Sequence, residues 1–268
     1  MNDFERQYYE SETFWNNTLQ DSLSQQRIRE TVTFIPKDVD SLVDIGCGNG
    51  IFLNYLSNVR KEIRSLGVDR SETALKYLKV DKLLGNIEKI PLDEKSFDCV
   101  TCLEVLEHIP FDGYTSALSE LARIARKYII VSVPFNENLE ENRNQCPHCK
   151  SIFNIELHFR TFDRNKMKSL FNDHDFKEIH TITFGEQQFL KGHKTYSNFI
   201  YPDNYKRFNV PICPVCGYST NTKQLQSSNS SSPLSFKKKI ISKLTKIPKL
   251  FWPKDKRDYW IMTLYNRA

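Results

Sequence analysis

The chain of 268 residues contains no run of eighteen apolar residues, so its sequence predicts no membrane-spanning helix. Residues 1–17 are polar and acidic, without the basic region and apolar stretch of a signal peptide. We therefore expect a cytoplasmic protein. Thiols stay reduced in that compartment, so the seven cysteines are not expected to form a disulfide framework.

Outside one late segment, the chain carries no net positive charge. Residues 236–257 contain nine Lys or Arg and one Asp, a net charge of +8, whereas the whole chain carries +5. The remainder of the chain is therefore net acidic. This distribution disfavours a nucleic-acid-binding function for the fold as a whole.

Strand and helix patterns alternate from residue 41 to residue 134. The stretch "SLVDIG" is an apolar run that ends in glycine, as a buried parallel strand does. Strands are predicted at 41–46, 63–69, 82–86, 97–104 and 128–134, and helices at 49–59, 71–79 and 113–127. Beyond residue 134 we expect a helix at 164–174 and strands at 176–184 and 258–267. This order predicts a parallel sheet with helical crossovers and a long insertion before the last strand.

The stretch "VDIGCGNG" places Gly46, Gly48 and Gly50 between a strand and a helix. Glycine there allows a sharp turn and a close approach of ligand to backbone. The dinucleotide fingerprint needs a further glycine at the position of Ile51, so a ligand with an amino-acid tail fits better. Asp69 ends the next strand, where a carboxylate can accept hydrogen bonds from ribose hydroxyls.

These motifs, with "GVDRS", "GNIEKIPLDEKSFDCV" and "CLEVLEHIP" in order, resemble the class I S-adenosylmethionine-dependent methyltransferases over residues 42–134. The ubiquinone-biosynthesis and other small-molecule enzymes exemplify the type. The resemblance implies an α/β, Rossmann-like fold, a mostly parallel seven-stranded sheet with an antiparallel last strand. It also implies a site for S-adenosylmethionine. The residues it implies for that site are Asp44, Gly46, Cys47, Gly48, Asp69, Arg70, Asn86, Ile87 and Glu104. Asn86 stands where the family often has Asp, and it could instead cap a turn.

The segment "CLEVLEHIP" is also the expected border of the acceptor site. A hydroxyl acceptor needs a base, and His108 is the first candidate, with Glu107 or His158 as alternatives. The competing explanation for the presence of Glu107 and His108 in this motif is that they pack below the site without taking part in the reaction. The segment lacks the Asn/Asp-Pro-Pro-aromatic motif of enzymes that methylate nucleic-acid amines, which favours oxygen or carbon acceptors.

Two Cys-x-x-Cys pairs, "CPHC" and "CPVC", lie far apart in the chain. Either pair alone could be a redox pair, half of a metal site or chance. Both pairs fall in connections that leave the carboxyl edge of the sheet, so together they predict one tetrahedral zinc site that holds two loops over the active site. The predicted ligands are Cys146, Cys149, Cys213 and Cys216, with His148 and His158 as spare ligands.

We divide the chain into an N-terminal helical cap (1–36), a cofactor-binding half (37–134) and a C-terminal half (135–268). The last part holds a four-cysteine zinc-knuckle insertion (146–216), a flexible Ser/Asn-rich linker (218–234), a basic amphipathic segment (236–257) and the final strand (258–267). The basic segment is predicted either to dock on the edge of the sheet or to lie, through 236–252, on the inner surface of an anionic membrane.

The predicted function is methyl transfer from S-adenosylmethionine to an oxygen of a sugar, a lipid-linked glycan or another small metabolite. One alternative is an RNA or tRNA methyltransferase that uses zinc and the basic segment on phosphates. The other is a non-catalytic cofactor-binding or scaffold protein.

Overall fold

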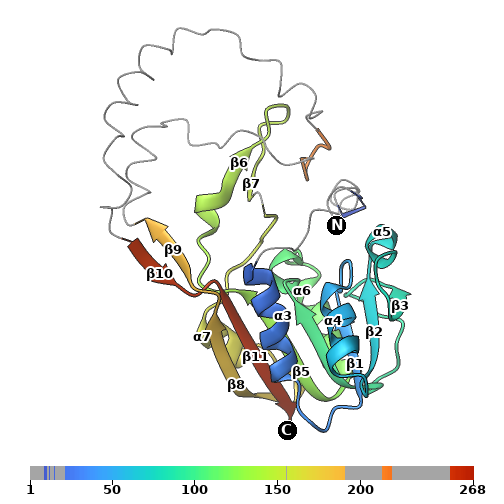
Figure 1. Cartoon of the computed structure of the whole chain (residues 1–268). Helices are drawn as coiled ribbons and strands as arrows, with labels where there is room; N and C mark the ends of the chain where they lie inside the picture. Colours follow the sequence, from blue (N-terminus) through green and yellow to red (C-terminus); the bar gives the residue numbers. More distant parts are fainter. Residues whose placement is uncertain are drawn as a thin grey trace, which may run out of the picture.

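In the computed structural model, the described residues are 22–154, 156–190, 213–218 and 254–268, together with Tyr9, Glu10, Glu12 and Trp15. They form one seven-stranded sheet in the order β3-β2-β1-β4-β5-β11-β8 (Figure 1). The strands are β1 (Ser41–Ile45), β2 (Arg64–Asp69), β3 (Asp81–Leu84), β4 (Phe97–Leu103), β5 (Ala125–Pro134), β8 (Phe176–Phe184) and β11 (Trp260–Arg267). The chain runs along β11 antiparallel to both neighbours, and the other pairings are parallel. The predicted fold class is thereby confirmed.

Helices cover both faces of the sheet. They are α3 (Ser22–Phe34), α4 (Ile51–Val59), α5 (Glu72–Leu75), α6 (Tyr114–Ile124) and α7 (Arg164–Ser169), with short 3-10 turns η1 (Leu106–His108), η2 (Leu139–Asn142) and η3 (Asn172–His174). Successive strand residues point to opposite faces. Leu42 accordingly packs with α3 and α4 in one core cluster, whereas Val43 packs with α6 and α7 in the other.

The helix predicted at 113–127 ends earlier, at Ile124, and β5 begins at Ala125. The two residues that follow face acidic partners beside the sheet. Arg126 lies 3.1 Å from Asp98, and Lys127 lies 3.2 Å from Asp38. These ion pairs and the pairing of Ala125 with Phe97 favour the strand over another helical turn. The helix predicted at 71–79 is likewise shorter, because α5 ends at Leu75.

Two small two-stranded antiparallel sheets project from the carboxyl edge of the large sheet (Figure 1). One pairs β6 (Arg143–Gln145) with β7 (Ile152–Asn154), and the other pairs β9 (Gln187–Leu190) with β10 (Lys254–Arg257). The sequence did not predict either pair. The end of the basic segment predicted at 236–257 is therefore a strand, and the final strand begins at Trp260 rather than at residue 258.

The rest of that segment (236–253), nearly all of the predicted linker and most of residues 1–21 lie outside the described residues. Within the ranges that the structure describes, no helix has the length and apolar character needed to cross a bilayer.

Candidate cofactor and acceptor site

The glycine turn lies at the carboxyl end of β1. Gly46 and Gly48 have φ angles of 78° and 54°, in the left-handed region that glycine enters at least cost. The amides of Gly46 and Cys47 both donate to the Val68 carbonyl, at 2.8 and 3.1 Å, which fixes the turn against the end of β2. A Cβ atom on Gly46 would lie 2.4 Å from Val105. A Cβ atom on Gly48 would lie 2.9 Å from the Trp15 ring, so both positions require glycine for close packing as well as for their backbone conformation.

Asp69 ends β2 beside this turn. One carboxylate oxygen accepts a hydrogen bond from the Gly48 amide and the other from the Ser71 amide, both at 2.8 Å. Burial raises the pKa of Asp69, although the two amides oppose the shift. Each oxygen has further lone pairs, so the carboxylate can still accept hydrogen bonds from a ligand.

Asp44 lies in β1, below the turn. Its carboxylate accepts a hydrogen bond from the Thr101 hydroxyl at 2.7 Å, and burial raises its pKa to about 7. The charge of Arg27, from α3, opposes that rise. The guanidinium of Arg27 also lies 5.8 Å from the centre of the Trp260 ring.

No sequence motif marks Arg27 as a site residue. Its buried Nε has no hydrogen-bond partner among the residues that the structure describes. A buried guanidinium N–H without a partner is costly. This donor, whose charge acts on the carboxylate of Asp44, suits an anionic group of a ligand.

The next predicted positions, Asn86 and Ile87, form a turn after β3. The Asn86 side-chain oxygen accepts from the Glu88 amide at 3.4 Å, and its carbonyl accepts from the Lys89 amide at 3.0 Å. Ile87 is buried in the core. Asn86 therefore caps a turn, as one of the two interpretations of the sequence expected.

Residues near the N-terminus lie across the ends of β1 and β2. The Tyr9 carbonyl accepts a hydrogen bond from the Ser71 hydroxyl at 2.8 Å, and the Arg70 guanidinium lies 4.7 Å from the centre of the Tyr9 ring. The Asn49 side chain donates to the Trp15 carbonyl at 3.3 Å. Tyr9 and Trp15 thus border the glycine turn. The sequence did not predict this contact, because both residues are far from the turn along the chain.

Glu104 directly follows β4 and has a φ angle of 58°. This left-handed conformation directs its buried carboxylate toward β5 and β11. One oxygen accepts from the Ser132 hydroxyl at 3.1 Å, and the other accepts from the Trp260 indole at 2.7 Å. Burial raises the pKa of Glu104, against the opposing charge of Arg27.

Glu107 and His108 lie in η1, next to Glu104. Glu107 is 1% exposed, and neither carboxylate oxygen has a hydrogen-bond partner within the described part of the chain. Burial, with the Glu104 charge, raises the pKa of Glu107 well above its usual value. Burial lowers the pKa of His108 to about 3, so this imidazole is neutral and a weak base.

His158 reaches the same place from the loop after β7. Its ring centre lies 4.6 Å from that of His108, and its Nδ1 lies 2.5 Å from a carboxylate oxygen of Glu137. Glu107, His108 and His158 each offer one ligand atom, and these three atoms lie within 4.8 Å of one another. The structure therefore joins the two predicted catalytic residues with the alternative base, and adds Glu137, which the sequence did not indicate.

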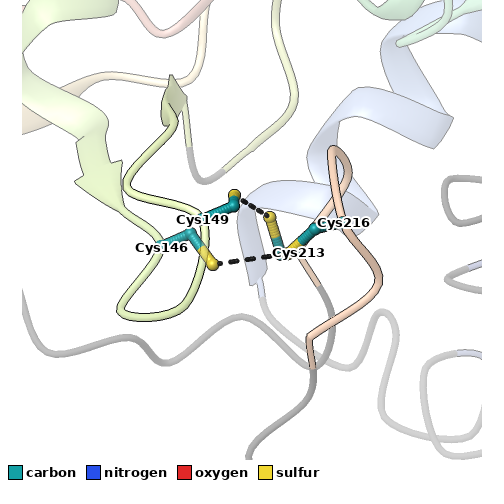
Figure 2. A group of neighbouring side chains, drawn as sticks. All are labelled: Cys146, Cys149, Cys213 and Cys216. Atoms are coloured by element: carbon teal, nitrogen blue, oxygen red, sulfur yellow. Dashed lines mark hydrogen bonds between the residues drawn. The ribbon is translucent and has the colours of Figure 1, made fainter.

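The two Cys-x-x-Cys pairs meet above the sheet, although 63 residues separate Cys149 from Cys213 (Figure 2). All four sulfur atoms lie within 4.8 Å of one another. The Sγ atoms of Cys146 and Cys216 are 3.7 Å apart, and those of Cys149 and Cys213 are 3.9 Å apart. The prediction that the pairs form one cluster is confirmed.

The two cysteine loops have the same backbone design. The Cys146 amide donates to the Ser151 carbonyl at 2.9 Å, and the Cys213 amide donates to the Tyr218 carbonyl at 2.8 Å, each five residues ahead. The residue four positions after the first cysteine, Lys150 or Gly217, returns a hydrogen bond to that cysteine's carbonyl and has a positive φ. The two loops thus have the same conformation, and their four thiols lie together.

Comparison with known proteins finds similarity to methyltransferases over part of the chain. Residues 43–130 match the family model described as a methyltransferase domain. An uncharacterised protein of Methanocaldococcus jannaschii is 30% identical over 137 residues, which are 49% of this chain and 56% of that protein. A ubiquinone biosynthesis O-methyltransferase of Alkalilimnicola ehrlichii is 33% identical over 95 residues, 32% of this chain and 37% of that protein. The chain thus spans about half, or less, of the length of these relatives.

Among solved structures, a SAM-dependent methyltransferase from Archaeoglobus fulgidus superposes with a TM-score of 0.52 at 16% identity. The superposition covers 98% of this chain and 97% of that one. At this identity the likeness concerns the fold alone.

Proposed function

We propose that this chain, whose residues 43–130 form a methyltransferase domain on a Rossmann-like class I fold, is an S-adenosylmethionine-dependent methyltransferase. Its acceptor is an oxygen of a sugar, a lipid-linked glycan or another small metabolite. The observation that carries the proposal is the convergence of three groups at one edge of the sheet. They are the backbone of the glycine turn, the Asp69 carboxylate and the Nε of Arg27, which is buried and unpartnered within the described residues.

These groups match the parts of the cofactor. Asp69 would accept hydrogen bonds from the ribose hydroxyls, because its oxygens lie at the end of β2. The turn at Gly46 and Gly48 would let the methionine part pass close to the backbone. Arg27 would pair with the cofactor's carboxylate, which gives its buried Nε an anionic partner.

Methyl transfer from a sulfonium is an in-line displacement with a good leaving group, so positioning supplies much of the rate. The acceptor would enter beside η1, which carries Glu107 and His108 and follows Glu104 closely in the chain. An oxygen acceptor is supported by the absence of the amine-methylating motif and by the similarity to the O-methyltransferase of A. ehrlichii.

A transfer assay tests the proposal. The purified protein is incubated with methyl-tritiated cofactor and fractionated extract, and Asp69→Ala serves as the matched control with weakened cofactor binding. We expect label in a glycan, lipid or small-metabolite fraction, at a rate that Asp69→Ala lowers. Label in RNA would replace this acceptor class with a nucleic acid. Absence of label from every fraction, with intact cofactor binding, would favour a non-catalytic binding protein.

A structural zinc ion held by Cys146, Cys149, Cys213 and Cys216 is the second part of the proposal. A tetrahedral ion with Zn–S bonds of about 2.3 Å places its sulfur atoms about 3.8 Å apart. The two Sγ separations of 3.7 and 3.9 Å fit that value. Four thiolates complete the coordination, so the ion would join the loop after β5 to the connection before β11 without a catalytic role.

A further inference from the structure

We propose that Glu107, His108 and His158 bind a divalent metal ion, separate from the cysteine cluster, at the acceptor side of the site. The ion would be a first-row cation such as Mn²⁺. One carboxylate and two imidazoles form a donor set typical of such ions, whereas thiolates select softer ones. The cysteine cluster and this group therefore differ in the metal they favour.

The strongest support is the Glu107 carboxylate. It is 1% exposed, and its two oxygens have no hydrogen-bond partner in the described part of the protein. Packing alone does not explain a carboxyl group that is buried without hydrogen bonds. An apolar side chain of similar size would fill the same space at a lower cost in free energy. A bound cation would supply the missing interactions of both oxygens.

His158 and His108 are placed as the histidine ligands of a metal ion are. The contact between His158 Nδ1 and Glu137 leaves Nε2 as the ring nitrogen for a metal. A carboxylate that holds the second nitrogen of an imidazole is the usual outer partner of a metal-bound histidine. The ligand atoms of Glu107, His108 and His158 lie within 4.8 Å of one another. Donors about 2.1 Å from one ion are about 3.0 to 4.2 Å apart, so a small closure would bring all three onto it.

The backbone holds the two segments together at this point. The Phe159 amide donates to the Glu107 carbonyl at 2.8 Å. The Arg160 guanidinium donates to the Leu106 carbonyl at 2.6 Å and also to that of Ile109. These contacts hold η1 and the segment that carries His158 together before any ion binds, which favours binding because little order is left to impose.

Three protein ligands leave coordination positions open for water or for oxygens of the acceptor. A hydroxyl bound to the ion loses its proton more readily, and the proton would pass to solvent water. The oxygen then forms the C–O bond as the S–C bond of the cofactor breaks. This role rests on the proposed methyl transfer, whereas the binding of the ion does not.

Mn²⁺ titration of the intact protein, followed by electron paramagnetic resonance, tests the site. We expect saturable binding of one Mn²⁺ per chain, and Cys213→Ser should retain this site with a loss of affinity smaller than the loss in any ligand variant. Glu107→Gln and His158→Asn should weaken the affinity more than about 100-fold, and Glu137→Gln, which removes the outer partner, about 10- to 100-fold. His180→Asn is the matched histidine control, because His180 stacks on Phe34, 5.0 Å away between ring centres, outside the cluster.

Circular dichroism and calorimetric cofactor binding show whether each variant is folded. Mn²⁺ affinity that is unchanged in folded Glu107→Gln, or no saturable binding to the wild-type protein, would overturn the inference. Either result would leave the proposed methyl transfer intact if the tritiated methyl group is still transferred to an acceptor in the transfer assay. Mn²⁺ binding with the expected variant pattern, but without any cofactor binding, would instead uphold the metal site and refute the proposed function.

Discussion

Asp69 offers the sharpest test of the cofactor site, and we expect Asp69→Ala to weaken the affinity for S-adenosylmethionine. The substitution removes the carboxylate that would accept the ribose hydroxyls. It also removes the acceptor that fixes the Gly48 amide, at 2.8 Å, beside the methionine part. A hydrogen bond to a charged group contributes about 1.5–3 kcal/mol. Since 1.36 kcal/mol corresponds to a factor of ten, the dissociation constant should rise about 10- to 150-fold.

Asp69→Asn refines this test. The amide keeps one carbonyl oxygen but replaces the other acceptor with an NH₂ group, which cannot accept from an amide or a hydroxyl. The substituted side chain would therefore satisfy either the Gly48 amide or the Ser71 amide, but not both. We expect an affinity between those of the wild-type protein and Asp69→Ala.

Asp98→Asn is the matched control. Asp98 is also buried and also accepts from backbone amides, those of Asp40 and Ser41, each at 3.2 Å. Those contacts lie at the start of β1, at the sheet edge opposite the cofactor. Isothermal titration calorimetry should give a lower affinity for the Asp69 variants and an unchanged one for Asp98→Asn. Equal affinity in folded Asp69→Ala and the wild-type protein would refute the role given to Asp69.

Three further predictions concern metal, pH and membranes. Freshly purified protein should contain one zinc per chain by elemental analysis, and Cys213→Ser should release it; a metal-free preparation with all seven thiols titratable would contradict the cluster's role. Asp44 has a pKa of about 7 in the fold and an ordinary value of 3.8, so the native state binds more protons than the unfolded state between these values. Its contribution to the free energy of unfolding should therefore fall by about 3 kcal/mol as pH rises from 4 to 7, seen as the difference between wild type and Asp44→Asn in denaturant titrations; parallel curves for the two proteins would argue against it. Residues 236–252, which we propose to lie on an anionic membrane, should give salt-sensitive co-sedimentation with anionic vesicles, each nearby lysine contributing about 1 kcal/mol; negligible binding at every lipid composition and salt concentration would leave the docked helix.

The strands of the sheet could be predicted because each has a recognisable apolar pattern in its own short stretch of sequence. The runs that became β1 and β4 are wholly buried and are bounded by glycine or polar residues, so their positions follow from the order of residues alone. The end of α6 could not be predicted in this way. Arg126 and Lys127 continue a good helical pattern, and their partners Asp98 and Asp38 come from distant parts of the chain.

The candidate site divides in the same manner. Cysteine spacing is specific enough that the meeting of the two pairs was predicted across a long insertion. Arg27 and Glu137 had no such signal, since a single charged residue in a helix or loop resembles any exposed one. Their importance comes from burial beside Asp44 and from the contact with His158, which depend on the completed topology.

The loop after β5 connects the two proposed metal sites. It carries Cys146 and Cys149 near one end and His158 near the other, and the Phe159 amide holds it to the Glu107 carbonyl at 2.8 Å. A zinc ion on the cysteines would restrict this loop from above, while η1 holds it from below. Loss of zinc should therefore loosen His158 more than Glu107 or Asp69, because the latter two lie in segments fixed by the sheet. It follows that the acceptor side should depend on the cysteine cluster for its order, and the cofactor side should not.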